Sequence, residues 1–129
     1  MLKRNPSVKR GPSVYADLRY QIEILLPMLY NDGREIESEK FTATFDELFG
    51  KFGGLRWTRQ NPPPYEGLWQ EAGQTYTDLI RTFIIETIHD NRIFRWLHSY
   101  KRKLEARFEQ IEVYITVTEI LRATPEGAA

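Results

Sequence analysis

The sequence contains no cysteine and only two histidines, and its formal net charge is zero. The missing thiols exclude disulfides, thiolate nucleophiles and cysteine-ligated zinc, a composition that fits a reducing cytoplasm. The balanced charge creates no overall field that would attract nucleic acid or an anionic membrane. No apolar run approaches the roughly 20 residues that span a bilayer. We therefore expect a cytoplasmic protein without a membrane segment.

Motifs that usually carry enzymatic chemistry are also absent. The sequence has no Gly-x-Ser-x-Gly nucleophile elbow, no glycine-rich phosphate loop and no His-Glu-x-x-His zinc motif. It predicts neither a bound metal nor a cofactor, and it favours a non-catalytic protein over an enzyme.

The 129 residues are 41% hydrophobic, 13% aromatic and 28% charged, which is enough apolar material for one folded domain. Residues 1–17 are predicted to form a flexible basic tail, because Met1–Val14 has four basic residues and no acidic one. A single domain follows over residues 18–121, and residues 122–129 form a short C-terminal tail. The basic tail leaves open a contact with nucleic acid or with an acidic partner.

Three segments have the residue pattern of β-strands. Thr77–Ile88 is the richest β-forming run and contains no glycine or proline, which predicts a central strand. Leu18–Leu29 alternates, with Tyr20, Ile22, Ile24 and Leu26 on one face. In Ile111–Thr118, which also alternates, Ile111 and Val113 fall on the predicted core face.

Two amphipathic helices are predicted between these strands. Ser38 is expected to cap the first helix, which ends at Gly53. The second helix begins after Asp90 or Asn91 and runs to about Gln110. Each helix has an apolar stripe at helical spacing, which is typical of core packing. The stripes consist of Phe41, Phe45, Leu48 and Phe52 in the first helix and of Ile93, Leu97, Tyr100, Leu104 and Phe108 in the second.

A long hairpin is predicted between the helices. Its first arm starts at Leu55–Gln60, is interrupted by the prolines of Asn61–Pro64 and resumes at Tyr65–Gln70. A tight turn leads to the return arm, Thr75–Ile88. The order strand, helix, hairpin, helix, strand is that of the ferredoxin-like split βαβ sandwich, an α+β fold. Right-handed crossovers then place both helices on one face of an antiparallel sheet and leave the other face open.

The open sheet face is the first candidate site. Glu23, Glu112 and Tyr114 alternate with core positions, and Glu86 joins them in one of the two possible phases of the central strand. Crowded carboxylates suit acid–base catalysis or cation binding. They are equally suited to pairing with arginines across the sheet or across a subunit interface.

Three further side chains are candidates. His89 follows the central strand beside Asp90, and a histidine–carboxylate pair is suited to proton transfer. An ordinary surface histidine is the alternative. Arg19 is expected near the carboxylates of the open face as a ligand-binding residue, and Arg107 is a candidate anion clamp.

The hairpin carries a group of aromatic residues. Such residues can anchor a partner subunit, stack on bases or cover their own sheet. The interface candidates are Trp57, Tyr65, Trp69 and Tyr76.

Several short motifs resemble small uncharacterised bacterial proteins in families of domains of unknown function. The first is a strand ending in Leu-Pro, followed by Asn31-Asp32-Gly33 and a helix closed by Phe52-Gly53-Gly54. The others are Gly67-x-Trp69, Arg107-Phe108-x-Gln110 and Glu112-Val113-Tyr114-Ile115, so that the resemblance covers roughly Tyr20–Leu121. This resemblance implies a ferredoxin-like fold, and it implies no particular activity.

These patterns favour a non-catalytic binding or assembly module, either a homo-oligomer or the partner of another protein, that associates through its open sheet face or its aromatic hairpin. The alternative is a small acid–base enzyme or small-molecule-binding protein with a carboxylate-lined pocket on the sheet. A third hypothesis is nucleic-acid contact through the basic tail.

Overall fold

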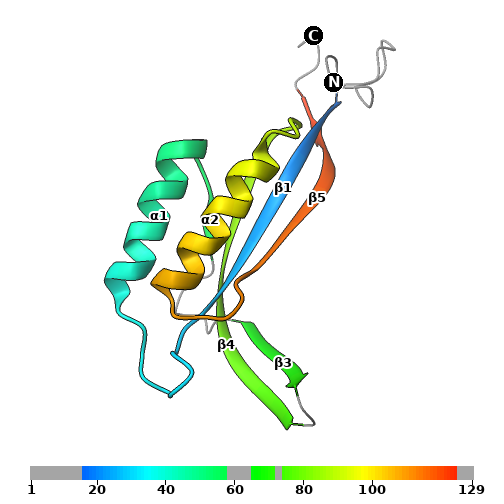
Figure 1. Cartoon of the computed structure of the whole chain (residues 1–129). Coiled ribbons are helices and arrows are strands. Elements are labelled where there is room, and N and C mark those ends of the chain that lie inside the picture. The colour runs from blue at the N-terminus through cyan, green and yellow to red at the C-terminus, as the bar shows by residue number, and fades with distance from the viewer. Residues whose placement is uncertain (1–15, 58–64, 72–73, 125–129) are drawn as a thin grey trace.

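A computed structural model describes residues 16–57, 65–71 and 74–124 of the protein (Figure 1). Its helices and strands follow one another in the predicted order, with the first hairpin arm divided into two strands. Along the chain they are β1 (Ala16–Pro27), α1 (Ser38–Phe52), β2 (Arg56–Trp57), β3 (Tyr65–Glu71), β4 (Gln74–Ile88), α2 (Ile93–Arg107) and β5 (Tyr114–Ala123).

The strands form one antiparallel sheet in the order β2-β4-β1-β5, and β3 pairs with β4 beyond β2. The central positions belong to β1 and β4, as the sequence predicts. Both helices lie on the same face of this sheet (Figure 1). The ferredoxin-like α+β fold is therefore confirmed.

The hydrophobic core lies between the two helices and the inner face of the sheet. In β1, Ile22, Ile24 and Leu26 are fully buried, in the alternation that the sequence shows. From the helices, Leu48 and Leu104 are equally inaccessible to solvent. The apolar stripes of both helices pack against the sheet, as their spacing predicts.

The pairing of β1 with β4 determines which side chains of β4 face the helices. Phe83 and Ile85 pair with buried residues of β1 and are themselves buried. Arg81 has the same phase, and its guanidinium carbon lies 4.7 Å from the centre of the Phe41 ring on α1. Side chains of alternate residues point to opposite faces of a sheet. The residues that face away from the helices are therefore Thr82, Ile84, Glu86 and Ile88.

The hairpin formed by β3 and β4 projects beyond the helices (Figure 1). Pairing between β1 and β4 ends at Pro27 and Ile80, whereas pairing between β3 and β4 continues outward from Ile80 to Gln74. The outer half of the hairpin is therefore a two-stranded ribbon in the part of the chain that the structure describes. The proline-containing segment predicted to interrupt the first arm lies outside the described residues.

The ends of α1 differ partly from the prediction. Ser38 is the first helical residue and not the cap, because Glu37 occupies the cap position and makes no side-chain hydrogen bond there. Gly53 does end the helix. Its φ of 79° is left-handed, and its N–H donates to the carbonyl of Phe49.

The connection from α2 to β5 also departs from the prediction. The helix ends at Arg107, and Glu109 then adopts a positive φ of 53°, which turns the chain before the expected end at Gln110. β5 begins only at Tyr114. Ile111, predicted to face the core, is 91% exposed and lies in the connection.

The paired ends of the sheet reach into segments that the sequence assigns to the tails. β1 starts at Ala16, where it pairs with Ala123 at the end of β5. Residues 1–15 and 125–129 lie outside the described residues. No helix in the described part of the chain is long and apolar enough to cross a membrane.

Candidate functional site

The face of the sheet that points away from α1 and α2 is not covered by either helix (Figure 1). We call it the open face. The strand registers place alternate residues of three strands on it. These residues are Asp17, Arg19, Gln21, Glu23 and Leu25 of β1, Thr82, Ile84, Glu86 and Ile88 of β4, and Tyr114, Thr116, Thr118, Ile120 and Arg122 of β5.

Two of the three predicted carboxylates share the open face. Glu86 of β4 lies opposite Gln21 of β1. Gln21 is in turn two residues before Glu23 on the same strand. The Oε2 atom of Glu86 accepts a hydrogen bond from Nη1 of Arg56 at 3.4 Å. Glu23 has no hydrogen-bond or ion-pair partner among the residues described.

The third carboxylate lies elsewhere, so the predicted cluster of three is wrong. Glu112 precedes β5, and its Oε2 atom accepts from Nζ of Lys101 on α2 at 3.2 Å. The connection is held near this helix because the N–H of Val113 donates to Glu105 at 3.1 Å. Tyr114 does lie on the open face, where it is exposed and pairs with Leu25.

Arg19 occupies the open face between Ile88 of β4 and Ile120 of β5. Its Nε atom is buried and has no hydrogen-bond partner in the described part of the chain. A buried donor without a partner is costly, and such groups in native proteins usually meet a ligand, a water or another chain.

The guanidinium of Arg107, the candidate anion clamp, is bound within the chain by Glu47 on α1. Nη1 donates to Oε1 of Glu47 at 2.9 Å, and Nη2 donates to Oε2 at 2.7 Å. The hydrogen bonds from Arg107, then those from Lys103 and Tyr100, lower the pKa of Glu47 to about 2. Burial and the hydrogen bond to Glu47 raise the pKa of Tyr100. This cluster joins the two helices.

His89 forms a histidine–carboxylate pair, but the partner is Glu119 of β5 and not Asp90. Its Nε2 atom lies 2.7 Å from Oε2 of Glu119, and its ring stacks on Tyr20 with 4.2 Å between centroids. Asp90 instead accepts hydrogen bonds from Arg92, which lower its pKa to about 2.

The His89 pair lies on the helix side of the sheet, because Glu119 pairs with the buried Tyr20. The hydroxyl of Tyr20 donates to Asn91, and burial is the main cause of its raised pKa. These contacts hold the loop between β4 and α2 against the sheet. Glu119 is 30 residues from His89 in sequence, so only the register of β5 brings them together.

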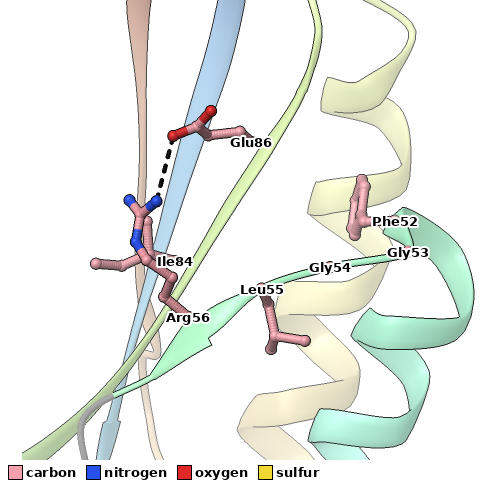
Figure 2. Close-up of a pocket in the computed structure, with 7 residues that line it drawn as sticks. All are labelled: Phe52, Gly53, Gly54, Leu55, Arg56, Ile84 and Glu86. Carbon is pink, nitrogen blue, oxygen red and sulfur yellow. Dashed lines mark hydrogen bonds and ion pairs between the residues drawn. The ribbon is translucent and has the colours of Figure 1, made fainter.

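Two shallow grooves follow the outer edge of β4. One has a volume of about 320 Å³ and lies above β2, where the Gly53–Gly54 connection passes the Arg56–Glu86 pair (Figure 2). The other, of about 260 Å³, lies between the ends of α1 and α2 and is lined in part by Asp90 and Trp96. Of the predicted site residues in the described part of the chain, Glu86 lines the first of these two grooves.

The hairpin aromatics are only partly described. Trp57 on β2 is 46% exposed, and its ring meets Phe45 edge-on at 5.0 Å between centroids. Trp69 and Tyr76 are cross-strand partners in the ribbon, and Tyr65 begins β3. The side chains of these last three lie outside the described part.

The described residues contain no group of three or more histidine, cysteine, aspartate or glutamate side chains placed to hold a metal ion.

No protein-family model and no curated protein sequence matches the chain. Its fold is similar to several solved structures. CutA1 from Oryza sativa is 13% identical with a TM-score of 0.53, and the match covers 85% of this chain and 84% of that one. The divalent cation tolerance protein CutA1 from Thermus thermophilus is 12% identical with a TM-score of 0.53, covering 79% of this chain and 84% of that one.

A phage SAM lyase in complex with S-methyl-5′-thioadenosine is 14% identical with a TM-score of 0.59, covering 95% of this chain and 100% of that one. At these identities the likeness establishes the shared α+β fold alone.

Proposed function

We propose that this protein is a non-catalytic assembly module that associates with further copies of itself through its hairpin and its open face. The observation that carries this proposal is the ribbon at the end of the hairpin. Beyond Ile80, from Leu79 to Gln74, β4 pairs with β3 and no longer with β1. Pro27 ends the pairing of β1, since proline has no N–H to donate.

A ribbon of two strands is marginal in water, because it buries too little apolar surface to offset the ordering of its backbone. Three or more strands, or a packed layer, usually supply the missing contacts. In the described part of this chain neither α1 nor α2 covers the ribbon (Figure 1). Packing against a second copy supplies such contacts, and the pair of Trp69 and Tyr76 would provide aromatic anchors.

The test is the association state of the full-length protein over a micromolar concentration series, measured by sedimentation velocity and native mass spectrometry. We expect the wild-type protein to be oligomeric and Trp69→Ala to weaken association about tenfold or more. Phe49→Ala is the matched control, because Phe49 is an exposed aromatic of the helix layer. A wild-type protein that stays monomeric throughout the series would refute self-assembly.

A second candidate function, small-molecule binding, is favoured by the groove beside Glu86 (Figure 2). It offers one carboxylate, one guanidinium and the backbone of two glycines, a set of groups suited to a polar ligand. Isothermal titration with S-methyl-5′-thioadenosine, the ligand of the phage SAM lyase, is a direct probe. A heat of binding that is seen with the wild-type protein and lost in Arg56→Ala would support this function. No heat of binding to the wild-type protein at millimolar ligand would count against this class of ligand.

Nucleic-acid contact through the basic tail stays a prediction, as does the cytoplasmic location. Contact through phosphates depends steeply on salt. Removal of Met1–Val14 should then abolish binding of an oligonucleotide that the full chain binds at low salt.

A further inference from the structure

The charged groups of the open face fall into two sets. Some are paired within the chain: Arg122 with Asp17 at 3.3 Å, and Arg56 with Glu86 at 3.4 Å. Arg19 and Glu23, by contrast, have no ion-pair partner among the described residues. Both are partly buried, and both lie on β1, the central strand of the face.

Arg19 and Glu23 do not pair with each other. They are four residues apart on one face, a separation of about 13 Å along a strand, and no contact joins them. The Nε atom of Arg19 is moreover buried without a hydrogen bond in the described part of the protein. A partly buried cation and a partly buried anion thus lie on the same strand, each lacking an opposite charge.

Apolar side chains lie beside both charges. Ile88 and Ile120 flank Arg19 across the sheet, whereas Glu23 lies between Ile84 and Thr116. Ile88 and Tyr114 are exposed. A sheet face that neither helix covers, and that mixes large apolar side chains with unpaired charges, is typical of a surface that another chain covers.

On the basis of the proposed self-assembly, we infer that the open face of a second copy covers this one, and that Arg19 of one copy pairs with Glu23 of the other. A second copy fits because the face complements itself. Each copy presents one cation and one anion on either side of Gln21, so the same surface supplies the partner for both charges. Isoleucines from the two faces then pack between the sheets, as the inner faces of β-sandwiches do.

Charge reversal tests this pairing. Arg19→Glu places like charges opposite Glu23 of the partner, and Glu23→Arg does the same with two arginines. We expect each variant to weaken self-association about tenfold or more. The double variant carrying both changes restores opposite charges between the copies, and it should associate within a few-fold of the wild type.

Mixing the two single variants gives an independent readout. In the mixture, the glutamate introduced by Arg19→Glu in one chain meets the arginine introduced by Glu23→Arg in the other. The unchanged Arg19 of the second chain likewise meets the unchanged Glu23 of the first. Mixed oligomers, detected by native mass spectrometry, should therefore be favoured over those of either variant alone. A fold defect in a single variant would not be repaired by mixing, and circular dichroism of each variant checks its fold.

Arg92→Glu is the control for net charge, because Arg92 is 91% exposed on the helix side and pairs only with Asp90 among the residues described. It should leave association unchanged. A wild-type oligomer that both single reversals leave intact would overturn this inference and leave the hairpin as the contact. A monomeric wild type would instead refute the proposed function itself.

Discussion

Arg107 of α2 and Glu47 of α1 form a two-point ion pair that ties the helices together, with N–O distances of 2.9 and 2.7 Å. Thr44, which is fully buried, accepts a further hydrogen bond from Nη1 of Arg107 at 2.8 Å. Two parallel bonds between guanidinium and carboxylate are among the stronger polar contacts in proteins.

Removal of one partner of this pair should destabilise the fold. Arg107 is only 16% exposed, so Arg107→Ala leaves the carboxylate of Glu47 with fewer partners in a half-buried site. We expect the free energy of unfolding to fall by about 1–3 kcal/mol, measured by urea denaturation. The control is Arg92→Ala, which removes an exposed ion pair. This substitution should change the free energy of unfolding by less than about 0.5 kcal/mol. Equal effects of the two substitutions would contradict the claim that the Arg107–Glu47 pair stabilises the fold.

The same pair predicts how stability depends on pH. The pKa of Glu47 is about 2 in the folded protein, against a usual value of 4.5. A lowered pKa adds stability above the unfolded value, and that stability is lost as the pH falls from about 4.5 towards 2. With Glu47 partly exposed, we expect a loss on the order of 2 kcal/mol.

Thermal unfolding between about pH 6 and pH 3 measures this dependence. Glu47→Gln cannot titrate, so its unfolding temperature should vary less with pH over this window than that of the wild type. If the unfolding temperatures of the two proteins change equally with pH, Glu47 does not contribute to the pH dependence of stability.

Two glycines at the end of α1 should respond in opposite directions to alanine. Gly50 lies inside the helix, and an added Cβ meets no atom within 4 Å, so Gly50→Ala should stabilise by about 0.5–1 kcal/mol. Gly53 has a φ of 79°, which alanine adopts at a cost, so Gly53→Ala should destabilise by about 1 kcal/mol. Differential scanning calorimetry would show one unfolding temperature rise and the other fall.

Local patterns were sufficient to predict the fold. The alternation of β1 and the apolar stripes of α1 and α2 predict which side chains form the core, because burial follows the repeat of each element. The left-handed end of α1 could also be predicted from local sequence, because Gly53 itself is the residue that adopts this conformation.

The site residues were harder to predict, because their partners are distant in sequence. Arg107 looks like a free cation until Glu47, 60 residues earlier, is placed beside it. Glu112 continues the alternation of β5, yet the hydrogen bond from Val113 to Glu105 holds this connection at α2. No periodicity within a single element records such contacts between elements.

The shortness of β2 has a consequence for solubility. β2 pairs only with Phe83 and Ile84 of β4. In the described part of the chain, the outer edge of β4 from Ile85 to Ile88 therefore has no strand beside it. Bare edges of this kind recruit strands from other molecules and start aggregation. Arg56 and Glu86 place two charges at this position, and charge on an edge strand opposes such recruitment. We therefore expect the Arg56–Glu86 pair, which also lines the groove, to oppose fibre-like association through this edge.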